Sequence, residues 1–402
     1  MSATLSAQCC VVGGGPAGLM AGFLLARAGV DVIVLEKHGD FLRDFRGDTI
    51  HPSTLRLMEE LGLLDEFLRL PHHKAYELAA WIGERKYKAA DFRSLGGRCN
   101  FIAFMPQWDF LDFIAAHARA LPNFKLLMQT SAEDLVWNGD RVVGVKATGP
   151  EGPLEISAPL VIAADGRGSH TRAEAHLDVE DLGAPMDVLW FKLPREESDP
   201  DETFGRIVPG RMLIMIDRGS YWQCGCVIPK GGAEELRQKG LEAFLDSIAK
   251  ATPFLADRVG TLTDWTQINL LTVQVNRAKT WSRPGLLCIG DAAHAMSPVG
   301  GVGVNLAIQD AVAAANLLAT KLRLGTVTDD DLAAMQRRRE FPVRVTQRLQ
   351  LAIQNRVVRS VLAADKSFEA PLALRLLNAA PLLRRLPARL IGLGVRPEHI
   401  AT

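Results

Sequence analysis

The first part of the chain alternates between short apolar runs and a helix-like stretch, which predicts a strand–helix–strand unit. Residues 8–12 form an apolar run that predicts a buried strand, and the helix-like stretch after it is closed by Gly29. Residues 30–35 form a second apolar run that ends at Glu36. A helix that connects two parallel strands is the building unit of α/β folds, so the chain opens with an α/β lobe.

Between residues 51 and 164 the pattern changes several times between helix and hairpin. It predicts a helix over 53–61 with Ser53 as its N-cap, a hairpin over 78–92, a helix over 110–120, a hairpin over 135–145 and a strand over 160–164. The second hairpin contains Asn138-Gly139, a pair that is typical of a type I′ turn. Antiparallel strands are therefore expected beside the parallel unit.

From about residue 186 the pattern becomes rich in strands. Strands are predicted over 188–193, 211–216, 221–228 and 265–275, with a helix over 236–251 that interrupts them. This arrangement indicates an inserted domain with an antiparallel sheet. Near Arg283 the chain returns to the first lobe, with a strand over 286–289 and a helix over 305–322.

The C-terminal quarter is predicted to be helical. Residues 329–364 indicate long helices, and Arg337-Arg338-Arg339 is expected on a solvated face. Residues 371–391 mix leucines with arginines and predict amphipathic packing against the body of the protein. Contact with a membrane surface is the alternative for this last segment.

Size, composition and charge narrow the class of protein. At 402 residues the chain is long enough for two or three lobes, and 48% hydrophobic and 23% charged residues are typical of a soluble globular protein. Lys+Arg and Asp+Glu balance at 46 each, which leaves no basic excess for nucleic acid. Residues 1–6 lack a signal-peptide pattern, and no uncharged apolar run is long enough to cross a bilayer. We therefore expect a cytoplasmic protein without stable membrane insertion, as a monomer or homodimer.

The six cysteines are expected to be reduced thiols in the interior. Cys9, Cys10 and Cys288 lie in runs that predict buried strands, and the sequence has no C-x-x-C motif. Cys224 and Cys226 could ligate a metal ion, but no further histidine or cysteine lies nearby at a suitable spacing. We expect no metal site.

A glycine-rich turn joins the first predicted strand to its helix. In Gly13-x-Gly15-x-x-Gly18 the three glycines permit a tight turn, close approach of backbone to a pyrophosphate, and close packing of helix on strand. Glu36, at the end of the second strand, is placed to bind the hydroxyls of an adenosine ribose. Because an acid disfavours a 2′-phosphate, the motif predicts FAD or NAD rather than NADP at this site.

A second glycine-rich stretch, residues 290–305, lies between a predicted strand and a predicted helix. Asp291 would accept hydrogen bonds from sugar-alcohol hydroxyls such as those of a ribityl chain. The amides around Gly303, Val304 and Asn305 would face the pyrimidine end of a flavin, where a helix N-terminus favours the negative charge of the reduced ring. The alternative is a tight turn that only caps the helix.

Three motifs in this order resemble those of the class A flavoprotein monooxygenases, the para-hydroxybenzoate hydroxylase-like aromatic hydroxylases. They are the first glycine motif with Glu36, Ala164-Asp165-Gly166, and Gly290-Asp291 with the loop over 298–305. The resemblance implies that Asp165 and Gly166 contribute to FAD and nicotinamide cofactor binding, and that Arg46 and Gln107 contact FAD. The alternatives are a turn residue at Asp165, a surface ion pair at Arg46 and a polar helix start at Gln107.

The resemblance also implies an α/β fold with a Rossmann-like FAD-binding domain, an inserted antiparallel β-sheet substrate domain and C-terminal helices. The expected domains are FAD-binding over 1–75, 100–184 and 276–330, substrate-binding over 76–99 and 185–275, and a C-terminal helical segment over 331–402. The residues expected to contact FAD are Gly13, Gly15, Ala17, Gly18, Glu36, Lys37, Arg46, Gln107, Asp165, Gly166, Gly290, Asp291, Gly301, Gly303, Val304 and Asn305.

The implied reaction uses NADH or NADPH to reduce FAD, which reacts with O₂ to give a C4a-hydroperoxide. One oxygen atom then passes to an electron-rich ring of an aromatic small molecule, and water leaves. A base that deprotonates a phenol is often needed, and His51 and Tyr221 are the candidates. Pro298, which begins the loop beside the flavin, is a further catalytic candidate. His294 is expected to be a packed histidine with a satisfied hydrogen bond.

The sequence departs from the family at the substrate. Relatives that act on small benzoates hold the carboxylate with Ser and Arg on the substrate-domain sheet, whereas residues 211–217 lack that pair and contain Met212 and Met215. We therefore expect a larger or less acidic substrate, unless these methionines are core packing.

Three rival functions stay open: a flavin-dependent halogenase, an isoprenoid reductase and a non-catalytic flavin sensor. At the halogenase motif W-x-W-x-I-P this chain has Cys224 and Cys226 in place of both tryptophans.

Overall fold

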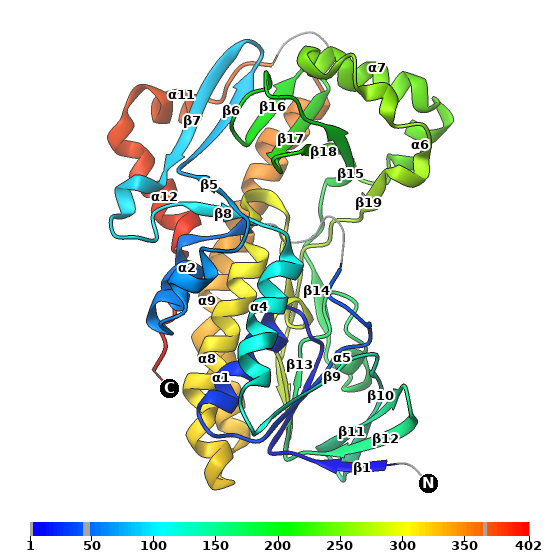
Figure 1. Cartoon of the computed structure of the whole chain (residues 1–402), viewed down its shortest axis with the longest axis vertical. Helices are drawn as coiled ribbons and strands as arrows, with labels where there is room; N and C mark the ends of the chain where they lie inside the picture. The colour runs from blue at the N-terminus through cyan, green and yellow to red at the C-terminus, as the bar shows by residue number, and fades with distance from the viewer. Residues whose placement is uncertain (1–2, 43–48, 365–367, 402) are drawn as a thin grey trace.

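The computed structural model describes residues 3–42, 49–364 and 368–401. Its lower half in Figure 1 is built on a six-stranded sheet in the order β21-β22-β13-β2-β3-β9, in which the five strands from β22 to β9 are parallel. The strands are β2 (Cys9–Val12), β3 (Val32–Leu35), β9 (Phe124–Leu127), β13 (Leu160–Ala163), β21 (Ser282–Arg283) and β22 (Leu286–Cys288). The predicted α/β class and the opening strand–helix–strand unit are confirmed.

The two faces of this sheet are covered differently. Cys9 and Val11 pack towards helices α1 (Pro16–Arg27), α4 (Gln107–Arg119) and α8 (Gly303–Leu324), where α1 contacts both α4 and α8. Cys10 and Val12 pack instead against a four-stranded sheet. That sheet has the order β1-β12-β11-β10 and contains β1 (Ala3–Ser6), β10 (Ser131–Asn138), β11 (Arg141–Gly149) and β12 (Gly152–Ser157). Alternate side chains of each central strand therefore enter two separate cores.

The hairpin of β10 and β11 is present, but its turn differs from the prediction. Asn138 pairs with Arg141, so the turn residues are Gly139 and Asp140 rather than Asn138 and Gly139. Gly139 has φ +60°, and Asp140 is not among the residues with positive φ. A positive φ at the first turn position alone is the type II′ pattern, so the type I′ prediction was wrong.

The upper half of the molecule is a seven-stranded sheet (Figure 1). Its order is β19-β15-β18-β17-β16-β6-β7, with β6 (Glu77–Ile82), β7 (Arg85–Asp91), β15 (Met186–Pro194), β16 (Phe204–Val208), β17 (Arg211–Asp217), β18 (Tyr221–Pro229) and β19 (Asn269–Leu271). Along β17, Leu213 and Met215 pack towards helix α7 (Leu241–Ala251), whereas Met212, Ile214 and Ile216 point to the opposite face. The division into an FAD-binding domain, a substrate domain and a C-terminal helical segment stays a prediction. The strands of the six-stranded sheet fall within the first of these, and those of the seven-stranded sheet within the second.

Three details of the upper half depart from the sequence prediction. The predicted helix over 236–251 is two helices, α6 (Ala233–Gln238) and α7, separated at Gly240 with φ +91°. The predicted strand over 265–275 is a 3-10 turn, η4 (Trp265–Gln267), followed by the short β19. Strand β16 was not predicted.

The C-terminal helices link the two halves. Helix α9 (Asp329–Ile353) lies along α8 and continues into a π-helix, η7 (Gln354–Val358), and α10 (Arg359–Leu362). Helix α11 (Leu372–Ala379) packs on β7, and α12 (Arg385–Gly392) packs on β7 and on η1 (Phe92–Leu95), joined by η8 (Pro381–Arg384). The predicted packing of this segment against the body is confirmed, although Leu382 and Leu386 remain mostly exposed.

The arginine run on α9 is not a uniformly solvated face. Arg337 is exposed, but Arg339 is 1% exposed and its Nε lies 2.9 Å from Asp310 Oδ1 of α8. Successive residues of a helix point about 100° apart, so three consecutive arginines cannot share one face. The prediction was wrong for Arg339.

The remaining elements are β4 (Thr49–Ile50), α2 (Pro52–Glu60), α3 (Leu64–Phe67), β5 (His73–Ala75), β8 (Ile102–Phe104), α5 (His170–Glu174), β14 (Val179–Asp181), η2 (Pro253–Leu255), η3 (Val259–Thr261), β20 (Asn276–Ala278), η5 (Gly290–Ala292), β23 (His294–Ala295) and η6 (Val299–Gly301). Among these elements, η2 and η3 pack against α7 in the upper half. The N-cap of helix α2 is His51, two residues before the predicted Ser53.

Helix α8 is the central helix of the fold. The segment 299–324 has the length and composition of a membrane span, and 72% of its most apolar window is buried inside the structure. Packing against α1 and α9 therefore accounts for its apolar character.

All six cysteines are buried and free. Burial raises the pKa of the Cys10 and Cys288 thiols to about 12 and that of Cys226 to about 11. Cys224 and Cys226 lie in the core under α7, in agreement with the predicted packed thiols.

Candidate active site

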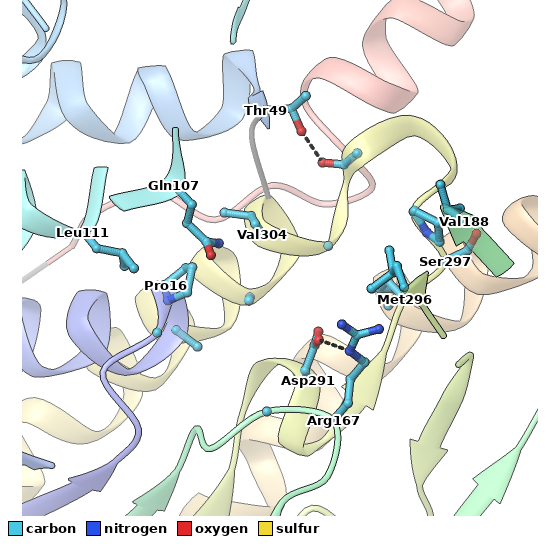
Figure 2. Close-up of a pocket in the computed structure, with 18 of the residues that line it drawn as sticks. Pro16, Thr49, Gln107, Leu111, Arg167, Val188, Asp291, Met296, Ser297 and Val304 are labelled. Atoms are coloured by element: carbon cyan, nitrogen blue, oxygen red, sulfur yellow. Dashed lines mark hydrogen bonds and ion pairs between the residues drawn. The ribbon is translucent and has the colours of Figure 1, made fainter. Parts of the chain in front are cut away.

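A single cavity of about 1000 Å³ runs from the glycine-rich turn after β2 to the inner face of the seven-stranded sheet. Its walls come from segments that are far apart in the sequence: the first strand–helix turn, the loop after β13, the loop before α8, helix α4 and strands β15 and β17. Figure 2 shows side chains from several of these segments facing one another across it.

The glycine turn at one end is shaped by contacts that exclude side chains. A Cβ on Gly13, which has φ +108°, would lie 2.4 Å from the carbonyl oxygen of Ala164, and a Cβ on Gly18 would lie 1.9 Å from that of Gly13. A Cβ on Gly15 would meet nothing within 4 Å, because Gly15 faces the open cavity. Two glycines are thus required by packing, and the third leaves room for a ligand close to the backbone.

Glu36 lies beside this turn and is held firmly. Its carboxylate accepts hydrogen bonds of 3.0 Å from the backbone N–H groups of Gly14 and His38. It lines the cavity together with Lys37. Each carboxylate oxygen can accept more than one hydrogen bond, so this group is suited to donors such as ribose hydroxyls.

The loop after β13 carries Asp165 and Gly166, which both line the cavity. Asp165 accepts a hydrogen bond from the Ser169 hydroxyl at 2.5 Å and one from the Thr171 amide at 3.0 Å. Asp165 therefore fixes the turn before α5 and also lines the cavity. Arg172 of α5 is buried and donates to the carbonyl of Ala292 at 2.7 Å, which braces this loop against the next one.

Gly290 and Asp291 follow strand β22. Gly290 has φ +59°, and its N–H donates to Asp310 Oδ2 at 3.0 Å. The Asp291 side chain is 39% exposed and points into the cavity, with Arg167 Nε 3.7 Å from its Oδ2 (Figure 2). Arg167 directly follows Asp165-Gly166 but was not among the predicted site residues.

The loop before α8 forms the next part of the wall. Pro298, Gly301, Gly303 and Val304 line the cavity. The carbonyl of Gly301 accepts a hydrogen bond of 2.9 Å from the Thr49 hydroxyl, as the dashed line in Figure 2 shows. Gln107 and Leu111 of α4 face the same cavity from another side (Figure 2).

Asn305 has a different place from its neighbours. It is buried behind the wall, where its Oδ1 accepts from the His51 amide and the Thr54 hydroxyl, both at 2.8 Å, and its Nδ2 donates to the Thr49 carbonyl at 3.0 Å. These bonds fix β4 and α2 to the loop. Asn305, Gly18 and Gly290 shape the cavity without lining it, and Arg46 lies outside the described residues.

The end of the cavity under the seven-stranded sheet is apolar. The side chains there are Leu78, Ile102, Phe104, Met186, Val188, Trp190, Thr203, Phe204, Met212, Ile214, Ile216, Val227, Leu271 and Val358. Within the part of the chain that the structure describes, none of the lining residues from this sheet is charged. Met212 therefore faces the cavity rather than the core, whereas Met215 is core packing.

The two candidate bases do not line this cavity. His51 is fully buried, its Nδ1 lies 2.8 Å from the carbonyl oxygen of Ile391, and burial lowers its pKa to about 4. Tyr221 begins β18, with Lys192 Nζ 5.5 Å from the centre of its ring. Because neither faces the cavity, we do not propose His51 and Tyr221 as catalytic residues. The third candidate, Pro298, does line the cavity.

His294 is packed against Trp281, and its Nε2 lies 2.6 Å from Asp310 Oδ2. Burial alone would raise the pKa of Asp310, but His294 and Arg339 outweigh it and hold the pKa below its usual range. The described residues contain no group of three or more His, Cys, Asp or Glu side chains placed to hold a metal ion.

Comparisons with known proteins agree with this geometry. A family model described as an FAD binding domain matches residues 6–349. The chain is 33% identical over 383 residues to 6-methylpretetramide 4-monooxygenase from Streptomyces rimosus, a match that covers 95% of this chain and 91% of that protein.

Solved structures share the fold. The crystal structure of p-nitrophenol 4-monooxygenase from Pseudomonas putida superposes with a TM-score of 0.77 at 22% identity, covering 96% of this chain and 97% of the other. The myxobacterial chondrochloren halogenase gives a TM-score of 0.75 at 20% identity, covering 96% and 90%. At these identities the likeness concerns the fold alone, which hydroxylases and halogenases have in common. The family match and the 33% identical relative show that this chain belongs to the FAD-binding family of class A flavoprotein monooxygenases.

Proposed function

We propose that this protein uses NADH or NADPH and O₂ to hydroxylate an apolar aromatic compound that carries no carboxylate. The observation that supports this best is the continuous cavity, which joins three FAD-type loops to an end without charged side chains. An ionised carboxylate would be costly to bury there because no cation from the sheet faces it.

The residues of the cavity fit FAD. Gly15 leaves backbone open to a pyrophosphate, Glu36 is placed for ribose hydroxyls and Asp291 for the ribityl chain. The amides at the start of α8, around Gly303 and Val304, would donate to the pyrimidine end of the ring and stabilise negative charge on it. Bound FAD supplies the redox chemistry: it accepts hydride from NAD(P)H and passes one atom of O₂ to the substrate.

The chain's own residues position the reactants and exclude water. The apolar side chains of β15 and β17 hold the aromatic ring and keep water out of the cavity. Exclusion of water favours transfer of the oxygen atom to the ring over its release as H₂O₂. The overall balance is NAD(P)H, H⁺, O₂ and Ar–H giving NAD(P)⁺, H₂O and Ar–OH.

Turnover with candidate substrates tests this function. The 6-methylpretetramide named for the relative is the first compound to try, with p-nitrophenol and para-hydroxybenzoate beside it. We expect an accepted ring to accelerate NAD(P)H oxidation and to gain one oxygen atom from isotope-labelled O₂. Para-hydroxybenzoate should leave the basal rate unchanged. A halide-dependent product would instead identify a halogenase, and no turnover with any ring would favour a flavin sensor.

The cofactor site has its own test. Replacing Asp291 by Ala removes the carboxylate proposed to hold the ribityl chain, and we expect the Kd for FAD to rise about tenfold or more. Titration of the apoprotein with FAD, followed by flavin fluorescence, measures this change. Arg141→Ala, at an exposed ion pair with Asp329, is the matched control. Unchanged FAD binding by Asp291→Ala would contradict the proposed site.

A further inference from the structure

Four glutamines lie on one face of the long C-terminal helix. Gln336, Gln347 and Gln350 belong to α9, and Gln354 begins the π-helix that continues it. At about 100° per residue, separations of eleven, three and four residues bring all four side chains to nearly the same side. We call these four residues the glutamine stripe.

Every member of the glutamine stripe binds the segment 276–299, which leads back to the cavity. Gln336 accepts from the Trp281 amide at 3.0 Å and donates to the Lys279 carbonyl at 2.9 Å. Gln347 donates to the carbonyls of Asn276 and Ala295 at 2.8 and 3.1 Å. The stripe thus fixes the backbone of this segment along its length.

The inner end of the stripe holds the part that faces the cavity. Gln350 accepts from the Ser297 amide at 3.2 Å and donates to the carbonyls of Ser297 and Val299, each at 2.9 Å. Gln354 donates to the Ser297 hydroxyl at 2.6 Å. Pro298, which has no N–H of its own, lies between the residues held by Gln350.

These bonds cannot be replaced by water. Gln350 is 3% and Gln354 0% exposed, whereas Ser297, Pro298 and Val299 line the cavity on their other side. The π-helix that starts at Gln354 also brings Val358 to the cavity. π-Helices are rare and occur mostly at functional sites.

We propose that Gln350 and Gln354 are positioning residues that hold Ser297, Pro298 and Val299 as a rigid wall against the flavin and substrate. This inference rests on the proposed function. A rigid wall keeps water out and the ring in place, so oxygen from O₂ reaches the substrate. With a loose wall, O₂ would be reduced without hydroxylating the ring. NAD(P)H, H⁺ and O₂ would then give NAD(P)⁺ and H₂O₂.

The test compares Gln350→Met with Gln336→Met, since both replace a glutamine of α9 that binds backbone on each side. Gln336 holds the far end of the segment and does not line or support the cavity wall. At saturating FAD and substrate, we expect Gln350→Met to raise the fraction of NAD(P)H that yields H₂O₂ roughly fivefold. Its Kd for FAD should rise by a similar factor, roughly fivefold. Gln336→Met should leave both quantities at the wild-type value, even where the two variants lose the same Tm.

Each outcome decides the proposal. Equal H₂O₂ fractions and equal FAD affinities in the two variants would overturn it. If Gln350→Met does not fold, Gln354→Met, which removes one hydrogen bond, is measured against the same control. Wild-type protein that oxidises NAD(P)H without hydroxylating any ring would overturn the proposed function, and the FAD titration would still separate Gln350→Met from its control.

Discussion

His51 is a buried residue that connects two segments of the chain by hydrogen bonds. Its Nδ1 must carry a proton to donate to the carbonyl of Ile391, and its backbone N–H donates to Asn305. It thereby ties the end of α12 to the loop that forms the cavity wall. Because the ring is fully buried, its pKa falls from 6.5 to about 4 and it stays neutral in the folded protein.

The neutral ring predicts a dependence of stability on pH. Between 6.5 and about 4 the unfolded chain binds a proton that the folded chain does not. The contribution of His51 to the free energy of unfolding should therefore be constant above the ordinary pKa and fall by about 3 kcal/mol as the pH drops through this range. Asparagine at this position can still donate to Ile391, and His51→Asn should remove this part of the slope.

Urea unfolding of wild type and His51→Asn, above the ordinary pKa and midway between the two values, measures the difference. His170→Asn, at a mostly exposed histidine, is the control. Identical pH slopes for wild type and His51→Asn would contradict the prediction.

At the scale of elements, the glycine turn between β2 and α1 separates a packing requirement from a binding requirement. Gly18 touches the carbonyl of Gly13, and Gly15 faces open space with φ −75°, a conformation that any residue adopts. The same fingerprint therefore contains two glycines that packing requires, Gly13 and Gly18, and one, Gly15, that leaves room for the ligand.

This separation predicts opposite phenotypes for two similar substitutions. Gly18→Ala forces a Cβ to within 1.9 Å of backbone, so α1 must move from the sheet and the free energy of unfolding should fall by about 3 kcal/mol. Gly15→Ala should change stability by less than about 0.5 kcal/mol but weaken FAD binding about tenfold, because its methyl group enters the space for the pyrophosphate. Unfolding without FAD and FAD titration measure the two effects. A stable Gly18→Ala, or a Gly15→Ala with normal affinity, would contradict this reading of the turn.

Elements with a strong local pattern were predictable, and those set by tertiary neighbours were not. The apolar runs of β2, β3 and β13 predicted the parallel sheet because each of these strands is buried on both faces, and the helix-like run of α1 predicted the connection between β2 and β3. Strand β16 is only five residues long and partly exposed, so its pattern was weak. The break between α6 and α7 depends on Gly240 in a left-handed conformation, which composition alone did not show.

At the scale of the whole molecule, a buried ionic cluster joins α8, α9, β23 and the C-terminal segment. Asp310 binds His294, Arg339 and the Gly290 amide, and Glu398 accepts from Arg338 at 2.6 Å and lies 3.6 Å from Arg339. The residues are too far apart in sequence to be paired by pattern. The candidate site was predictable at its motifs, while Arg167, Thr49 and the glutamine stripe appeared only when distant segments met.

Neutralising Asp310 tests the weight of this cluster. Asp310→Asn removes the carboxylate that accepts from Arg339 Nε at 2.9 Å and leaves Glu398, 3.6 Å away, to balance this buried guanidinium. We expect a loss of about 3–5 kcal/mol in the free energy of unfolding. Arg337→Ala, at the exposed pair with Asp330, should cost less than about 1 kcal/mol. Chemical denaturation of both variants measures these values. Similar losses in the two would show that the cluster is no stronger than a surface ion pair.

The burial of all six cysteines bears on the H₂O₂ that the proposed reaction would release when hydroxylation fails. Peroxide attacks thiolates, not thiols, and a pKa of about 12 at Cys10 and Cys288 leaves almost no thiolate at neutral pH. In the folded protein the thiols should therefore not be sulfenylated during turnovers that release H₂O₂. Oxidation of the cysteines should begin only in molecules that have unfolded. Packing of the core would thus protect the cysteines from H₂O₂ formed in the cavity.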